Sequence, residues 1–412
     1  MFLIFLHYIV LTRCLNYNYS MEKVDYLSPI VKWAGGKEQE LKYILPNIPD
    51  RFTRFIEPFV GGGAVYFSMK NKSMLINDKS VELIALYNNI KYNNKDFISS
   101  LQSLQNTWIG LEGILDKNIE FFNKEYTQYK LNKINKDELI EDIAKFVTSN
   151  KTCFEQILNS ELLKNYDIFE KELLRNISAK LVRMRDLEEK KGNLPEKDIY
   201  DNFECALKGS FYMFIRTLYN KYDNSEYFYF IREYCYSSMF RYNSNGEFNV
   251  PYGGISYNRK NFQRKIDYIK SKELQNHFIN TNIYNLDFED FFNEIKLSEN
   301  DFIFLDPPYD TDFSSYVNNA FDKKDQERLA NYLINKCPAK FMLVIKNTEF
   351  IMNLYIDKGL HINSFDKKYM VSFKGRNNRD CEHLIITNYQ LPTVKNKVAA
   401  LELKLNDQLQ YA

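Results

Sequence analysis

Two groups of strand-length apolar runs, one near each end of this chain, constrain its fold more than any other feature. The runs lie at 54–59, 73–77, 301–305, 340–345 and 383–388. Helix-spaced apolar residues follow at 81–90, and others occupy 324–335 between two of the later runs. Strands that alternate with helices are typical of a mostly parallel sheet with helices on both faces. The sequence therefore predicts the α/β class, with a doubly wound sheet made from two separated halves.

The stretch between these groups, about 93–235, has a different composition. It is charged, poor in proline and glycine, and helical in periodicity over segments such as 137–158 and 174–187. The segment 190–198 (KKGNLPEKD) has the composition of a loop. We therefore expect a largely helical insert between the two halves of the sheet.

The charge balance limits how the chain can bind nucleic acid. Its 412 residues include 55 Lys and Arg and 54 Asp and Glu, which gives a formal net charge of +1. A protein that coats nucleic acid without sequence preference normally carries a strong basic excess. Any surface for nucleic acid must therefore be locally basic. The 45% hydrophobic and 26% charged residues are typical of a soluble globular protein and exclude a collagen-like or wholly disordered chain.

The sequence indicates neither a metal centre nor a membrane segment. Its six cysteines are scattered without a C-x-x-C pair, and its four histidines show no H-E-x-x-H spacing. The apolar start, 1–10, lacks a preceding basic residue and a small-residue cleavage site, and it is too short to span a bilayer. We expect a reduced, cytoplasmic protein without metal. Residues 1–27 are expected to form a flexible leader, and a start codon placed too early, before Met21, is the alternative explanation.

A glycine-rich turn follows the first apolar run, where Phe59 precedes Gly61 and Gly63. Glycines at a strand-to-helix turn let a ligand approach the backbone and the positive end of the helix. Asp78 ends the second run, where an acid can accept hydrogen bonds from both ribose hydroxyls. The G-x-G-x-x-G pattern is not met, because Tyr66 stands at its third glycine. A mononucleoside-like ligand is therefore favoured over a dinucleotide, although a tight turn without a ligand has the same pattern.

The sequence Asp306-Pro307-Pro308-Tyr309 follows the run 301–305, at the strand end where open α/β sheets place their sites. Two consecutive prolines stop the strand and fix the backbone. Asp306 and the Pro307 carbonyl can then accept both N–H bonds of an exocyclic amine that attacks an electrophile, while Tyr309 stacks on the base. A Pro-Pro turn with Asp and Tyr beside it by chance is the alternative interpretation.

Four motifs together resemble one family. The segment 29–37 (PIVKWAGGK) resembles the opening motif of Dam-type DNA adenine-N6 methyltransferases of the D12 class, α-class arrangement. Phe59-x-Gly61-x-Gly63 resembles their donor-binding motif, 306–309 their D-P-P-Y catalytic motif, and 241–253 (RYNSNGEFNVPYG) their target-recognition sequence. The motifs occur in the family's order and span residues 28 to about 389, which makes the set far more specific than any one motif.

The resemblance implies a Rossmann-like, doubly wound methyltransferase sheet with an inserted, largely helical target-recognition domain. The catalytic domain would comprise 28–92 and 280–390, the insert and recognition region 93–279, and a polar tail 391–412. The donor would be S-adenosylmethionine, no metal would be needed, and the substrate would be an adenine flipped out of double-stranded DNA. A cognate restriction endonuclease is a possible partner, and a solitary modification enzyme is the other form.

The resemblance also implies residue roles. Trp33 would pack near the donor's sulfonium and Lys37 near its carboxylate, while Gly61 and Gly63 approach it and Asp78 holds the ribose. Asp287 would grip the donor's adenine, although a strand-end Asp explains that position almost as well. Trp33 could instead anchor the core. The expected contacts of the target adenine are Asp306, Pro307 and Tyr309, and Asp306 would border the donor as well.

Two basic clusters are candidates for contact with DNA phosphates. The first contains one acid, Glu247, and comprises Arg241, Arg259, Lys260, Arg264 and Lys265. The second contains no acid and comprises Lys367, Lys368, Lys374, Arg376 and Arg379. Arg241 is the candidate base reader, and Tyr236 and Asn258 are candidates for base or stacking contacts. A solvated basic face is the alternative for each cluster.

Departures from the family's pattern leave the target sequence open. Gly254 stands where GATC-specific relatives tend to have arginine, and Ser237-Ser238 replace their usual Asn-Gly. Related chemistry on RNA, on a protein amide or on cytosine N4 remains an alternative, and Asp306 and Trp33 argue against it. A DNA-binding module with a decayed site is another alternative, although every catalytic motif position is intact. An NAD-dependent dehydrogenase is disfavoured by the missing third glycine.

Overall fold

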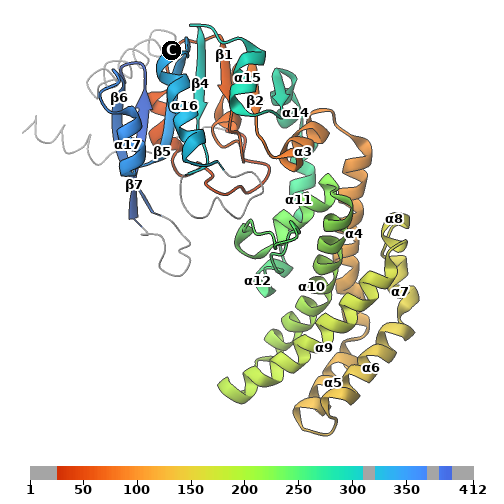
Figure 1. Ribbon diagram of the computed structural model, residues 1–412. Coiled ribbons are helices and arrows are strands. Elements are labelled where there is room, and N and C mark those ends of the chain that lie inside the picture. The colour runs from red at the N-terminus through yellow and green to blue at the C-terminus, as the bar shows by residue number, and fades with distance from the viewer. Residues whose placement is uncertain (1–25, 310–320, 369–379, 392–412) are drawn as a thin grey trace, which may run out of the picture.

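The computed structural model describes residues 26–309, 321–368 and 380–391. These residues form a seven-stranded sheet in the order β3-β2-β1-β4-β5-β7-β6 (Figure 1). The strands are β1 (Arg54–Glu57), β2 (Met74–Asn77), β3 (Thr281–Tyr284), β4 (Asp301–Leu305), β5 (Lys340–Lys346), β6 (His361–Lys368) and β7 (Asp380–Thr387). Neighbours from β3 to β5 pair in parallel, whereas β7 is antiparallel to β5 and β6. The prediction of an α/β fold with a mostly parallel sheet is confirmed.

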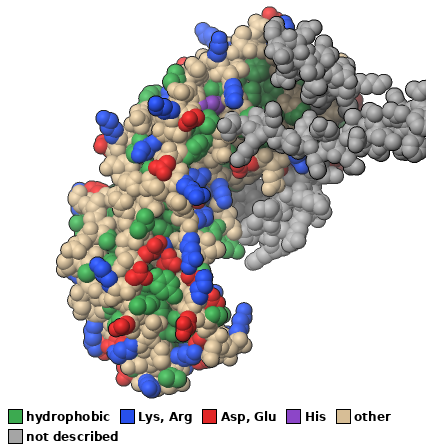
Figure 2. All heavy atoms as spheres, turned by 180° about the vertical axis from the view of Figure 1, so that it is seen from behind, with side chains coloured by type: hydrophobic (Ala, Val, Ile, Leu, Met, Phe, Trp, Pro, Cys, Tyr) green, Lys and Arg blue, Asp and Glu red, His purple; other side chains and the backbone are tan. Residues whose placement is uncertain are grey.

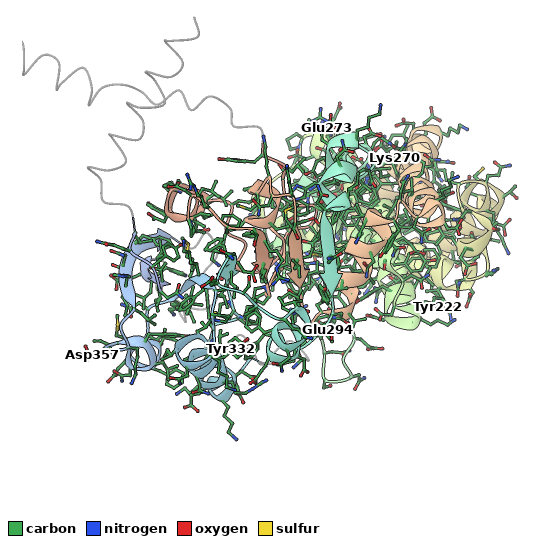
Figure 3. The ribbon with its side chains drawn as sticks, turned by 90° about the horizontal axis from the view of Figure 1, so that it is seen from above. Tyr222, Lys270, Glu273, Glu294, Tyr332 and Asp357 are labelled. Carbon is green, nitrogen blue, oxygen red and sulfur yellow. The ribbon has the colours of Figure 1, made fainter. Side chains whose placement is uncertain are left out.

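Helices cover both faces of the sheet. Successive side chains of a strand point to opposite faces, and the apolar ones on each face are buried under helices. These helices are α3 (Val81–Lys91), α14 (Lys272–Ile279), α15 (Phe288–Ile295), α16 (Lys323–Asn335) and α17 (Glu349–Tyr355). Phe55 of β1 belongs to one hydrophobic core, with residues of α3 and α14. Its neighbour Ile56 belongs to a second core, with residues of α15, α16 and α17. Glu273 of α14 and Tyr332 of α16 accordingly lie on opposite sides of the sheet (Figure 3).

A helical insert joins α3 to β3 and extends away from the sheet (Figure 1). Its helices are α4 (Lys95–Lys117), α5 (Ile119–Lys130), α6 (Lys136–Ser149), α7 (Lys151–Gln156), α8 (Ser160–Leu163), α9 (Tyr166–Lys191), α10 (Glu196–Tyr222), α11 (Ser225–Tyr234), α12 (Ile255–Asn258) and α13 (Phe262–Ile269). Local sequence sets several of their ends: Asn135 and Glu138 form a capping box at the start of α6. The loop between α9 and α10 is shorter than the predicted 190–198, because α9 continues to Lys191.

Short helical turns complete the described secondary structure: α2 (Leu41–Ile44) and the 3-10 turns η1 (Leu45–Asn47), η2 (Tyr66–Ser68) and η3 (Tyr236–Ser238). No helix among the described residues is long and apolar enough to cross a membrane. The predicted leader and tail lie almost entirely outside the described residues.

The strand order fixes where a ligand can bind. From β1 the chain moves outward to β2 and β3, and it then returns to place β4 on the other side of β1. The connections that leave β1 and β4 therefore diverge, and they open a crevice at the carboxyl ends of these two strands. Both chemical motifs of the sequence begin there, since β1 ends at Glu57 and β4 at Leu305.

Candidate active site

A cavity of about 570 Å³ lies at the carboxyl ends of β1 and β4. Its lining brings together three separate parts of the sequence, namely the opening motif with Trp33 and Lys37, the glycine turn, and Asp306 to Tyr309. Asp78 and Asp287, which end or follow neighbouring strands, line it as well. This volume falls within the usual range of small-molecule sites.

The glycine turn is shaped so that only glycine fits. Gly61 has φ +45° and Gly63 has φ +73°, both in the left-handed region. A Cβ atom on Gly61 would lie 2.8 Å from Cδ1 of Trp33. The Gly61 N–H donates to Oδ2 of Asp78 at 2.9 Å. The turn therefore packs beneath the Trp33 ring, and its backbone is anchored to Asp78.

Asp78 is held in place from two sides. Its Oδ1 accepts from the backbone N–H of Ser80 at 2.9 Å, just before α3, and its Oδ2 accepts from Gly61. Burial raises the pKa of Asp78, and the two backbone N–H groups oppose that rise. The carboxylate is thus fixed at the cavity wall before any ligand arrives.

Lys37 joins the opening motif to the D-P-P-Y sequence. Its buried Nζ donates to Oδ2 of Asp306, to the Tyr309 hydroxyl at 2.9 Å and to the Gly35 carbonyl at 2.8 Å. The ammonium also lies 5.3 Å from the centroid of the Tyr309 ring. The side chain expected near the donor's carboxylate thus contacts the catalytic motif in this structure.

Glu57 is a cavity residue that the sequence interpretation missed. It ends β1, is buried, and its Oε2 has no hydrogen-bond partner among the described residues. Burial, reinforced by the nearby charge of Asp306, raises the pKa of Glu57 well above its usual value. The charge of Asp306 therefore disfavours ionisation of Glu57 at the same wall of the cavity. The only sequence signal was an acid directly before Pro58 at a strand end.

Comparison with known proteins identifies the family. The model for "D12 class N6 adenine-specific DNA methyltransferase" matches residues 33–206 and 171–371, which is most of the chain. The chain belongs to this class of DNA adenine methyltransferases. It is 28% identical, over 88% of its length, to the "Type II methyltransferase M.CviBI" of Paramecium bursaria Chlorella virus NC1A, and covers 100% of that protein.

Two further relatives extend the comparison. The enzyme is 28% identical to the "Type II methyltransferase M.MjaIII" of Methanocaldococcus jannaschii, over 88% of the chain and 99% of that protein. It is 24% identical to the "Retron Ec67 DNA adenine methylase" of Escherichia coli, over 80% of the chain and 81% of that protein. The matches to these methyltransferases therefore extend beyond the short motifs.

The segment 236–258 contains the predicted target-recognition sequence 241–253, and part of it borders the cavity of this methyltransferase. We call it the recognition segment. Its Phe240 ring packs edge-on against Trp33, with ring centroids 4.4 Å apart. Asn245, Gly246 and Glu247 of the same segment also line the cavity. The opening motif and the recognition segment thus both contribute to the wall of this cavity.

The predicted DNA contacts in and beside this segment differ in their exposure and in the partners they bind. Tyr236 is 50% exposed. Arg241 is exposed, and its guanidinium donates to the side chain and the carbonyl of Asn249, at 2.6 and 2.7 Å. Arg259 is 68% exposed and pairs with Asp201 at 3.1 Å. Lys260 donates to the Glu233 carbonyl at 2.6 Å. Lys374 and Arg376 lie outside the described residues.

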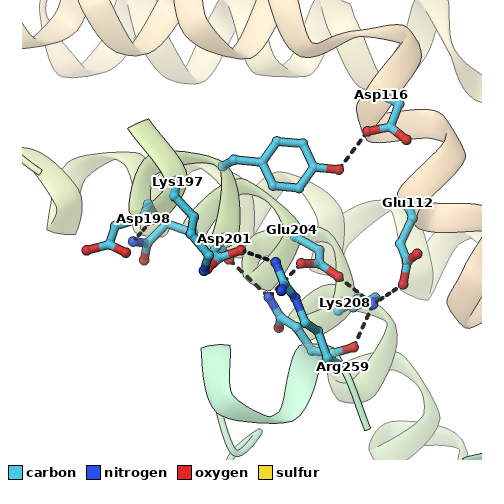
Figure 4. Close-up of polar contacts among 11 residues, drawn as sticks. Glu112, Asp116, Lys197, Asp198, Asp201, Glu204, Lys208 and Arg259 are labelled. Carbon is cyan, nitrogen blue, oxygen red and sulfur yellow. Dashed lines mark hydrogen bonds and ion pairs between the residues drawn. The ribbon is translucent and has the colours of Figure 1, made fainter. Parts of the chain in front are cut away.

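Asn258 is buried, which contradicts its prediction as a base contact. Its Oδ1 accepts from the Tyr252 hydroxyl at 2.8 Å, and its Nδ2 donates to the Asp201 carbonyl at 3.0 Å. The ammonium of Lys208, shared with Glu112 and Glu204, donates to the Asn258 carbonyl at 2.7 Å (Figure 4). Asn258 therefore fastens α12 to α10, and its side chain lies in the protein interior.

Asp287 lies at the cavity but also has a structural role. It caps α15 by accepting from the Glu289 N–H at 3.1 Å, and it pairs with Arg328 of α16 at 2.7 Å. No group of three or more metal-ligating side chains occurs within 26–309, 321–368 and 380–391.

Proposed function

We propose that this DNA adenine methyltransferase takes its methyl group from S-adenosylmethionine and delivers it to N6 of an adenine flipped out of duplex DNA. The observation that carries the proposal is the joining, in one cavity, of the glycine turn and Asp78 with Asp306 and Tyr309. The first pair suits a nucleoside-bearing donor, and the second suits an exocyclic amine.

The residues present fit the donor. The glycine turn exposes backbone without side chains, Asp78 offers a fixed carboxylate for a ribose, and Trp33 closes the turn with an aromatic ring. When bound, the donor supplies a sulfonium-activated methyl group, which needs no metal to make it electrophilic. We assign Trp33, Gly61, Gly63 and Asp78 to donor binding, with Asp287 at the edge of the same site.

The remaining residues act on the amine. We propose that Asp306 and the Pro307 carbonyl accept hydrogen bonds from its two N–H groups, which directs the nitrogen lone pair toward the methyl group. The new N–C bond replaces the S–C bond, and the methylated amine then loses one proton to solvent. Tyr309 stacks against the base, and Lys37 orients both Asp306 and Tyr309 through its hydrogen bonds. The raised pKa of Glu57 lessens the repulsion between two carboxylates next to the amine. Positioning of this kind supplies much of the rate in a displacement with a good leaving group.

The test is transfer of labelled methyl from S-adenosylmethionine to mixed-sequence duplex DNA, followed by nucleoside analysis. N6-methyladenine as product supports the proposal, and Asp306→Ala should abolish it while sparing DNA binding. Label in RNA, in protein or in N4-methylcytosine, with none in adenine, would overturn it. Sequencing of DNA from cells that express the enzyme then returns the target site.

We also propose that the enzyme modifies one short target in the cytoplasm, either with a cognate restriction endonuclease or alone. The support is the "Type II" in the names of two relatives. Resistance of the modified DNA to a nuclease that shares its target would support the paired form. Arg241 remains the proposed base reader, with Tyr236, Arg259, Lys260, Lys374 and Arg376 as further DNA contacts.

A further inference from the structure

A basic cleft lies outside the candidate active site, where residues 28–37, which we call the opening segment, meet α11 and α13. Its volume is about 400 Å³, and its lining includes Ser28, Glu233, Lys260, Arg264 and Lys265. Two hydrogen bonds fix its walls: Lys265 donates to the Ile30 carbonyl at 3.3 Å, and Tyr268, also in the lining, donates to the Ser28 carbonyl at 2.7 Å. The shape of the cleft therefore follows from the packing of α13 against the opening segment.

Positive charge exceeds negative charge in this cleft. Among the described residues that line it, three cations face one carboxylate, that of Glu233. Glu233 pairs with Lys260 at 3.3 Å, whereas neither Arg264 nor Lys265 forms an ion pair with any described residue. Burial lowers the pKa of Lys260, and the charge of nearby Lys32 adds to this effect. An anion in the cleft would offset this excess, because a concave basic surface concentrates counter-charge.

The cleft adjoins the recognition segment through one aromatic side chain. The ammonium of Lys260 lies 4.0 Å from the centroid of the Tyr257 ring. The hydroxyl of Tyr257 accepts from the backbone N–H of Ser237, next to Tyr236, at 3.0 Å. Figure 2 shows Lys and Arg side chains gathered near the middle of the molecule, between its sheet-bearing and helical parts. The cleft is therefore directly joined to the segment proposed to contact the duplex.

We propose that the cleft binds a backbone phosphate of the duplex beside the target base, through Arg264, Lys265 and Lys260. The inference rests on the proposed function, since it requires DNA as the substrate. Arg264 and Lys265 supply positive charge that no described carboxylate pairs with. Lys260 supplies a hydrogen-bond donor that its ion pair with Glu233 already orients. Such a contact fixes the register of the protein on DNA and carries no sequence information.

The experiment compares R264Q/K265Q with a control, K133Q/K136Q, which removes the same charge from exposed positions far along the insert. Affinity for a mixed-sequence duplex is measured against salt concentration. Each phosphate contact contributes about 0.9 to the slope of log affinity against log salt. R264Q/K265Q should flatten the slope by roughly 1 to 2 relative to the wild type. The control should leave it unchanged.

An unchanged slope in R264Q/K265Q, or an equal change in the control, would overturn the proposal. R264Q alone, at an exposed side chain, gives the same test if the double variant folds poorly. Inorganic phosphate serves as a second probe: loss of its competition in R264Q/K265Q while the DNA slope stays unchanged would mean a free-anion site and would also overturn it. Absence of methyl transfer by the wild type, with a flattened slope in R264Q/K265Q, would refute the proposed function but support the cleft.

Discussion

Replacement of Arg232 by methionine should loosen the junction between the opening segment and the recognition segment. The guanidinium of Arg232, on α11, is buried. It donates to the carbonyl of Met239 at 2.5 Å and to those of Lys32 and Ser238 at 2.9 Å each. Its central carbon also lies 3.6 Å from the centroid of the Phe240 ring. One side chain thus holds the backbone of both segments.

The expected loss of stability follows from these three carbonyls. Methionine fills much of the volume but donates nothing, and a buried acceptor left without a donor costs about 1–3 kcal/mol. Part of that cost is offset, because none of the described carboxylates pairs with Arg232 and its burial as a cation is itself unfavourable. We expect the free energy of unfolding to fall by about 3 kcal/mol.

Urea denaturation measures this loss, and Arg216→Met is the matched control. Arg216 is half-buried on α10 and donates to the Val250 carbonyl of the recognition segment at 3.1 Å, with no bond to the opening segment. It should cost about 1 kcal/mol. Arg232→Met should weaken binding of both S-adenosylhomocysteine and DNA, whereas Arg216→Met should spare the former. Unchanged denaturation and unchanged binding in Arg232→Met would refute this role of the guanidinium.

Three further substitutions test the cavity and the sheet. Gly61→Ala should weaken the binding of S-adenosylhomocysteine about tenfold, because the added Cβ meets Trp33 and the left-handed backbone costs a non-glycine residue about 1 kcal/mol or more. Calorimetry measures this affinity, and equal affinity in the variant would contradict the role of the turn. Folding raises the pKa of Glu57. The contribution of this side chain to the stability of the wild type therefore falls as pH rises above about 4.3, which is the pKa of glutamate in the unfolded chain. Glu57→Gln should therefore gain in relative stability from pH 5 to pH 8, and a constant difference between denaturation curves would argue against a neutral Glu57. Burial alone would raise the pKa of Asp301, but hydrogen bonds from Arg54 and Ser298 more than offset it. Asp301→Asn should cost about 2 kcal/mol at pH 7, and the difference should shrink as pH falls below about 3.9; a loss that does not change with pH would exclude the ion pair as its source.

The position of the site could be predicted because it depends on local patterns and one rule of topology. The central strands are buried on both faces, so β1, β2 and β4 appear in the sequence as apolar runs. Their carboxyl ends meet at one edge of a parallel sheet, which places Asp78 and Asp306 near each other although they are far apart in sequence. Strand positions alone sufficed for this step.

Edge strands and long-range polar contacts could not be predicted in the same way. Strands β3 and β6 lie at the two edges of the sheet, and their sequences, TNIY and HINSFDKK, are too polar to form apolar runs. Asn258 was predicted as a base or stacking contact. Its actual partners, Asp201 and Glu204, lie 57 and 54 residues away on α10. Nothing local to Asn258 encodes that contact.

The charge of the insert shows why the net charge of +1 says little about affinity for DNA. Some of its carboxylates pair with nearby cations, as Glu112 and Glu204 do with Lys208, and such pairs cancel at short range (Figure 4). The basic cleft differs because Arg264 and Lys265 form no ion pair with a described residue. Each phosphate contact releases counterions and strengthens binding to any sequence, so an enzyme with few such contacts leaves unmodified sites readily. A balanced total with a small unpaired cluster is therefore the distribution of charge that suits a search for one short target.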